Sequence, residues 1–100
     1  MCTYNRRFCL KQAIDSVLCQ TYPDFEFVIV DDGSTDGTEE LIKSYQDPRI
    51  RYFKLDQNSF YCYAANQGLD HCQGDYVAFM NSDDAWLPDK LEKQVSVMEQ

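Results

Sequence analysis

The 100-residue sequence predicts an α/β domain in which helices flank a parallel β-sheet. Two observations support this prediction. Strand-length apolar runs alternate with helix-period apolar stripes, and short polar links join them. Residues 27–30 form an unbroken apolar run rich in β-branched side chains, which is typical of a strand covered on both faces. With 44% hydrophobic residues the chain can fill a core, and residues 1–100 have the length of one domain or part of one.

The first part of the chain predicts a strand end, a helix and a buried strand, in that order. Residues 1–5 read as the end of a strand that runs into a loop, so we expect the first strand to be truncated. Residues 7–19 carry a single apolar stripe, which predicts an amphipathic helix. The strand at residues 27–30 follows, and the acidic, glycine-containing residues 31–37 form a turn after it.

The rest of the chain continues the alternation. Asp36 and Glu39 have the spacing of a capping box at the start of the next helix. Residues 76–80 form a second wholly apolar run, which predicts another buried strand. The expected elements are helix, strand, helix, strand and helix, at residues 38–45, 50–55, 64–72, 76–80 and 87–98.

Charge and composition exclude several classes of function. The net charge of −8 disfavours unassisted contact with nucleic acid or an anionic membrane surface. No apolar run is long enough for a transmembrane segment and no secretory signal opens the chain, so we expect a cytoplasmic protein, the cytoplasmic face of the membrane included. Five cysteines without a C-x-x-C pair predict reduced thiols that serve as small core residues: Cys2, Cys9, Cys19, Cys62 and Cys72.

Polar clusters follow the predicted carboxyl ends of the strands. Because parallel strands end at the same edge of a sheet, these clusters should lie together, and ligands bind at that edge in open α/β sheets. Solvation of turns and helix capping is the alternative, but it would scatter polar residues over both edges. We therefore favour a ligand crevice lined by residues 3–5, 31–34, 58–59 and 81–84.

The chemistry of this edge favours a divalent metal. The sequence contains neither G-x-x-x-x-G-K-[ST] nor G-x-G-x-x-G, so no glycine-rich loop is available to bind phosphates. Carboxylates would repel a diphosphate by roughly 4 kcal/mol per charge pair at about 4 Å and an effective dielectric constant of about 20. Mg²⁺ or Mn²⁺ reverses that sign and commonly uses one or two carboxylates, an arrangement that Asp83 and Asp84 fit.

Several motifs, in order and over nearly the whole chain, resemble those of the family 2 glycosyltransferases. They lie in residues 3–5, 20–26, 31–36, 64–68 and 81–88. The resemblance implies a GT-A fold of which residues 1–100 form the nucleotide-sugar-binding half. It also implies inverting transfer of a sugar from a nucleoside-diphosphate sugar, usually a UDP-sugar, to a hydroxyl of a glycan or lipid-linked acceptor, as in polysaccharide biosynthesis.

The resemblance also assigns roles to residues. It implies that Asp32 hydrogen-bonds the uracil and that Asp83, the last acid of a D-x-D motif, binds Mn²⁺ or Mg²⁺ on the diphosphate. The loop formed by residues 3–5 would pack around the base. The full set is Thr3, Tyr4, Asn5, Asp32, Asn66, Asn81 and Asp83 for the nucleotide, with Asp83 and Asp84 for the metal.

The sequence departs from the family pattern in three places. Asn81 occupies the first D-x-D position, where it can bind a ribose but adds no charge. Ala65 stands where an Arg is common, which removes a possible diphosphate contact. The acceptor half and its catalytic base are absent from these residues, so we expect no catalytic residue here. A non-catalytic nucleotide-binding module or a nucleotidyltransferase-like domain is the alternative, although Tyr4 and Asn5 speak against the latter's glycine- and arginine-rich first loop.

The truncated first strand has a consequence for stability. By the resemblance it belongs between the strands at residues 27–31 and 76–80, so its loss would expose two inner sheet edges. Unpaired backbone groups on apolar strands invite pairing with another chain. We therefore expect this chain to self-associate and to be less stable than a whole domain.

Overall fold

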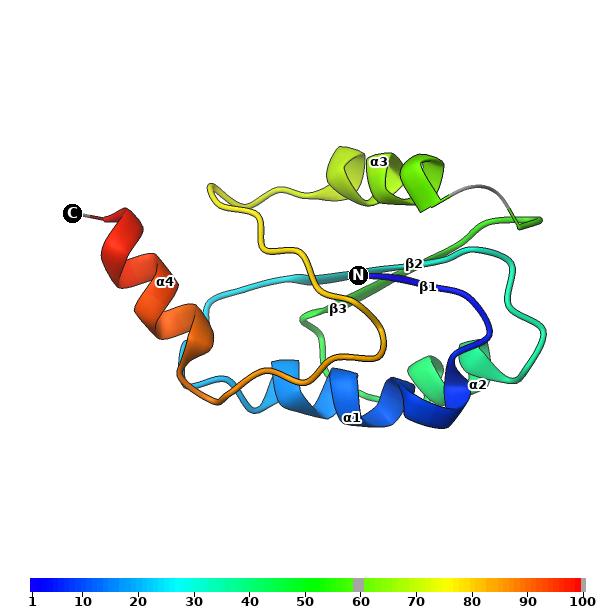
Figure 1. Cartoon of the computed structure of the whole chain (residues 1–100), viewed down its shortest axis with the longest axis horizontal. Helices are drawn as coiled ribbons and strands as arrows, with labels where there is room; N and C mark the ends of the chain where they lie inside the picture. The colour runs from blue at the N-terminus through cyan, green and yellow to red at the C-terminus, as the bar shows by residue number, and fades with distance from the viewer. Residues whose placement is uncertain (59–60, 100) are drawn as a thin grey trace.

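The computed structural model describes residues 1–58 and 61–99; Ser59, Phe60, Gln100 and the side chains of Tyr61 and Cys62 lie outside the described part. A three-stranded parallel sheet lies between helices α1 and α2 on one face and α3 on the other, while α4 projects from one end (Figure 1). The α/β prediction is thus confirmed. The elements are β1 (Cys2–Thr3), α1 (Arg7–Leu18), β2 (Phe27–Asp31), α2 (Thr38–Lys43), β3 (Ile50–Lys54), α3 (Tyr61–His71) and α4 (Lys90–Met98).

Strand β2 is the centre of the sheet, and all five of its residues are buried. It pairs in parallel with β1 on one side and with β3 on the other. Its side chains alternate between the two faces, as the pleat of a strand requires. Phe27 and Ile29 belong to the core cluster with the apolar stripe of α1, whereas Val28 and Val30 pack with Ala64 of α3. Burial on both faces explains why residues 27–30 are uniformly apolar.

The predicted first strand exists but is only two residues long. β1 lies beside β2, and a single parallel bridge joins Cys2 to Asn81. The prediction that the first strand lies between the strands at residues 27–31 and 76–80 is confirmed in part: β1 lies between β2 and Asn81, but residues 76–80 form no strand.

The predicted strand at residues 76–80 is wrong. These residues form no strand, and Val77 and Phe79 are largely exposed, whereas Met80 is buried. The isolated Cys2–Asn81 bridge lies just after this segment, and no strand within residues 1–58 and 61–99 pairs with residues 76–79. An apolar run without a hydrogen-bonding partner does not become a strand, because each strand needs a neighbour for its backbone groups.

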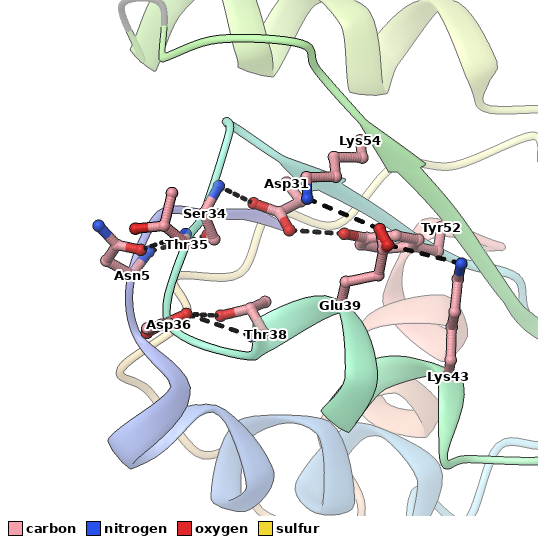
Figure 2. A network of polar contacts seen from close by, with 10 residues as sticks. All are labelled: Asn5, Asp31, Ser34, Thr35, Asp36, Thr38, Glu39, Lys43, Tyr52 and Lys54. Carbon is pink, nitrogen blue, oxygen red and sulfur yellow. Dashed lines mark hydrogen bonds and ion pairs between the residues drawn. The ribbon is translucent and has the colours of Figure 1, made fainter.

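The predicted capping box at the start of α2 is also wrong. The N-cap residue is Gly37, with φ of 89°, in place of Asp36. The Asp36 carboxylate accepts hydrogen bonds from the Thr38 amide at 3.2 Å and from the backbone N–H of Arg7 at 3.0 Å, which fixes it one position before the helix. Glu39 forms ion pairs with Lys43 at 3.5 Å and Lys54 at 3.6 Å and so does not reach back to the cap (Figure 2).

Helix α4 has no buried residue, and polar contacts attach it to the rest of the molecule. The buried Gln20 side chain donates a hydrogen bond to the Leu87 carbonyl at 2.7 Å and accepts one from the Leu91 amide at 3.0 Å. Thr21 Oγ1 donates to Glu92 Oε2 at 2.6 Å. Neither α4 nor any other helix in residues 1–58 and 61–99 is both long and apolar enough to cross a membrane.

The cysteines whose side chains are described are free thiols: Cys2, Cys9, Cys19 and Cys72. Three of them are half-buried, but Cys19 is exposed, so the prediction that it fills the core is wrong. Cys19 is the C-cap residue of α1, where the chain leaves the buried stripe.

Candidate functional site

An open cavity of about 460 Å³ lies where the first strands end, and each of the four predicted polar clusters contributes to its lining. Thr3 and Tyr4 come from the first cluster and Asp32 from the second. Asn58 comes from the third, whose other member, Ser59, is outside the described residues, and Asn81 and Asp83 come from the fourth. The structure therefore brings together residues that are far apart in the sequence at one edge of the sheet.

The two adjacent acids after the buried run have different surroundings. Asp31 is fully buried and accepts hydrogen bonds from the Ser34 amide at 2.9 Å and the Tyr52 hydroxyl at 2.5 Å (Figure 2). Burial, together with the bond to Asp31, raises the pKa of the Tyr52 hydroxyl, which therefore remains a donor. Asp31 thus holds the turn, whereas Asp32 lines the cavity.

Asp32 is held in place by its neighbours on both sides. Its backbone N–H donates to the Thr3 carbonyl at 2.8 Å, which joins the turn to the end of β1. Its carboxylate accepts a hydrogen bond from Asn58 Nδ2 at 3.1 Å. With only 6% of its surface exposed, Asp32 presents an acceptor whose position is set before any ligand arrives.

Gly33 permits the close approach that brings Asn58 to Asp32. Its φ of 84° is one that other residues rarely adopt. A Cβ at this position would lie 2.8 Å from the backbone nitrogen of Asn58 and 2.9 Å from the carbonyl carbon of Gln57. The glycine is therefore required by both the turn conformation and the packing of the next loop.

Thr3 lines the cavity, and its hydroxyl has no hydrogen-bond partner among the described residues. The residue is 3% exposed, and its Oγ1 is the one buried side-chain oxygen or nitrogen in that part of the chain without such a partner. A buried hydroxyl without a partner costs about 1–3 kcal/mol.

Asn5 does not line the cavity, and its hydrogen bonds connect two loops. Its backbone N–H donates to Ser34 Oγ at 2.9 Å, and its Oδ1 accepts from the Thr35 amide at 2.8 Å (Figure 2). It adopts a positive φ of 50°, which Asn tolerates better than most residues. Asn5 therefore ties the loop that carries Tyr4 to the turn that carries Asp32.

The turn after residue 80 carries the predicted metal ligands. The Asp84 amide donates to the Asn81 carbonyl at 3.1 Å, and the Cys9 thiol donates to the Ser82 carbonyl at 3.7 Å. Asp83 is exposed and lines the cavity, whereas Asp84 is exposed and does not. In the described residues, no group of three or more His, Cys, Asp or Glu side chains is arranged to hold a metal by itself.

Asn66, like Asn5 and Asp84, is a predicted site residue that does not line the cavity. It lies on α3 and is exposed, whereas Ala64 of the same helix is buried and forms part of the cavity wall. The assignments of Asn5, Asn66 and Asp84 to the site remain predictions that rest on the family resemblance.

Sequence reasoning missed some residues of the cavity wall, notably Cys2 and Arg6, whereas Ser82 belongs to the predicted cluster at residues 81–84. Burial raises the pKa of the Cys2 thiol, so this residue lines the cavity in its neutral form. Arg6 directly follows the loop at residues 3–5, and that adjacency was the available signal.

Comparisons with known proteins agree with this geometry. The family model described as glycosyl transferase family 2 matches residues 1–100. The putative teichuronic acid biosynthesis glycosyltransferase TuaG of Bacillus subtilis is 46% identical over 98 residues, which are 96% of this chain and 39% of TuaG. The chain thus spans well under half of this relative.

Solved structures show the same fold. TarS of Staphylococcus aureus (residues 1–349), in complex with UDP, superposes with a TM-score of 0.92 at 28% identity, covering 98% of this chain and 30% of that one. The mannosyltransferase PcManGT of Pyrobaculum calidifontis, in complex with GDP-Man and Mn²⁺, gives 0.90 at 26% identity over 99% of this chain and 31% of that one. The predicted GT-A fold is confirmed, and the chain belongs to glycosyl transferase family 2.

Proposed function

We propose that this chain forms the donor-binding part of an inverting glycosyltransferase that uses a UDP-sugar and a divalent metal, Mn²⁺ or Mg²⁺. One observation supports the proposal most strongly: Asp32 and Asp83, from separate loops, line one cavity together with Thr3 and Tyr4. TarS, which shares the fold, is described in complex with UDP.

In this proposal Asp32 selects the base. A carboxylate can only accept hydrogen bonds, and the uracil ring offers an N–H. The corresponding ring nitrogen of cytosine has no proton, so the same carboxylate would face an acceptor. Thr3 and Tyr4, which line the same cavity, would contact the nucleoside beside Asp32.

Asp83 is the residue best placed to hold the metal. Mg²⁺ and Mn²⁺ need few protein carboxylates when substrate phosphates complete their coordination, so a single exposed carboxylate on the cavity wall fits this chemistry. A bound ion would neutralise the charge that develops on the leaving diphosphate. Asp84 would have to turn toward the cavity to bind the metal. Asn81, which lines the cavity, would contact the ribose.

The acceptor and the catalytic base belong to the part of the enzyme that this chain does not include. The chain covers 39% of TuaG, whose name refers to teichuronic acid biosynthesis. By analogy, the acceptor would be a hydroxyl of a growing polysaccharide or of a lipid-linked sugar, and the enzyme would act on the cytoplasmic side of the membrane. These residues would then bind and orient the donor without completing the transfer.

Calorimetric titration of UDP, GDP and dTDP, each with Mn²⁺ and with EDTA, tests the metal role and the choice of base. We expect UDP to bind most tightly, and only with Mn²⁺. The Asp83→Ala variant should lose about tenfold or more of the metal-dependent affinity, since even outer-shell partners of a metal are worth that much.

The matched control is Asp70→Ala, which removes an exposed acid of α3 outside the cavity. It changes the net charge by the same amount and should leave UDP binding unchanged. Equal UDP affinity in EDTA and in Mn²⁺ would refute the metal role, and tighter binding of GDP would refute the choice of uracil.

A further inference from the structure

Arg6 is a cationic side chain on the cavity wall that the assignments above leave without a role. It follows the loop at residues 3–5 and is the N-cap residue of α1. Arg49 and Arg51 form ion pairs with Asp47 at 2.7 Å and Glu26 at 3.2 Å. The Arg6 guanidinium has no hydrogen bond or ion pair within the described residues, and the side chain is exposed.

The electrostatics of the cavity make this cation important. Asp32 and Asp83 both line the cavity, and the chain as a whole carries a net charge of −8. Among the described residues that line the cavity, Arg6 is the only one with a positive charge. Helix α3, which forms part of the wall through Ala64, contains no Lys or Arg. Arg6 is therefore the cationic side chain that an anionic ligand in this cavity would contact.

Stability does not explain an arginine at this position. The amino-terminal end of a helix carries a partial positive charge, so a cation there is unfavourable, and the first turn of α1 contains no acid to offset it. Arg6 also packs into neither core cluster. Its removal should leave the fold at least as stable as before.

We propose that Arg6 binds the diphosphate of the nucleotide in this cavity. The planar guanidinium presents paired N–H donors that match phosphate oxygens, and such charge-assisted hydrogen bonds are about twice as strong as neutral ones. Arg6, at the N-cap of α1, thereby supplies a positive charge to the cavity, and α3 contains no Lys or Arg that could do so. This inference rests on the proposed nucleotide-binding function.

Arg7 provides a matched control because it has the same charge at the next position. It does not line the cavity, and its side chain lies against Gly37 at the start of α2, where Arg7 Nε would be 3.1 Å from a Cβ placed on that glycine. Arg6→Gln and Arg7→Gln change the net charge equally. A difference in UDP affinity between the two variants therefore reports a local contact and not the overall electrostatic field of the chain.

The experiment is calorimetric titration of UDP and of uridine, in Mn²⁺, into the wild-type chain and both variants. Arg6→Gln should weaken UDP binding by about tenfold, the usual size of one lost charged hydrogen bond, and should leave uridine binding unchanged. Arg7→Gln should change neither by more than about twofold, because exposed charges beyond the contact distance are screened. Thermal melts should show that both variants fold like the wild type.

The outcomes separate the two proposals. If UDP binds the wild type and Arg6→Gln equally well, or if both variants lose the same affinity, the role of Arg6 is overturned while the proposed function stands. If Arg6→Gln weakens uridine as much as UDP, the contact is not with the diphosphate. If the wild type binds neither UDP nor GDP, the proposed function fails and the role of Arg6 fails with it.

Discussion

Two regions of this molecule have similar proportions of apolar residues but differ in how they bury them. In the sheet region, residues 1–54, an apolar run becomes the central strand, and all five residues of β2 are buried. In the C-terminal region, residues 76–99, a run of the same kind forms no strand, and α4 buries none of its residues. Phe79 is 65% exposed, although its sequence context resembles that of the buried Ile29.

The difference shows that a strand depends on its neighbours as well as on its own residues. Residues 27–30 have β3 on one side, β1 on the other and helices on both faces. Residues 76–79 have no strand beside them. The C-terminal region is attached instead through polar contacts of Gln20 and through Trp86, which packs against the edge of the main core. Apolar composition supplies the tendency to form a strand, and pairing decides whether the strand forms.

The largest effect should come from supplying the missing neighbour. Adding about five apolar residues before Met1, the usual length of a strand, should extend β1 and pair it with residues 76–80. Burial of Val77 and Phe79, at about 1.5–3 kcal/mol for each side chain, should stabilise the chain by about 3 kcal/mol. For a domain of this size that corresponds to a rise in Tm of about 10 °C or more, measured by thermal melting.

The same pair of chains tests the prediction of self-association. Light scattering should show oligomers for the 100-residue chain and a monomer for the extended one, because the extension covers unpaired sheet edges. Two monodisperse monomers with equal Tm would show that the unpaired segment is not what limits stability.

The same substitution, made once in each region, should reduce the free energy of unfolding by different amounts. Val30→Ala removes two methyl groups from a fully buried side chain and should cost about 2 kcal/mol of unfolding free energy. Val97→Ala removes the same groups from a side chain that is 66% exposed and should cost less than about 0.5 kcal/mol. Denaturant titration measures both, and equal costs would contradict the division into a packed and an unpacked region.

The elements that the sequence predicted correctly are those whose pattern is local. The stripe of α1 and the run at residues 27–30 each contain enough information in their own spacing, and both appear where expected. The prediction for residues 76–80 failed because a strand also needs a pairing partner, which a local pattern cannot reveal and which the described residues do not supply. The cap of α2 failed because Asp36 is also bound by the backbone of Arg7, a contact that sequence spacing cannot reveal.

The candidate site was predictable in outline but not in detail. The position of polar residues after strand ends placed Asp32 and Asp83 at one edge, and the structure brings both to one cavity. The sequence alone did not reveal that Asp31 turns inward to Tyr52, although alternation along a strand makes neighbouring residues face opposite sides. Arg6 was missed because its adjacency to the loop at residues 3–5 was the only signal, and a cation at the start of a helix has no distinctive pattern of its own.

The most direct test of the proposed donor site in the sheet region is the choice between UDP and CDP, measured by calorimetry on the wild type and on Asp32→Ala. The wild type should prefer UDP by about 1.5 kcal/mol, or about tenfold, because the Asp32 carboxylate can accept a hydrogen bond from the ring N–H of uracil, whereas the corresponding ring nitrogen of cytosine has no proton. Asp32→Ala should bind UDP more weakly and lose the preference. Comparable binding of both nucleotides to both proteins would contradict the assignment of this cavity to a uridine nucleotide.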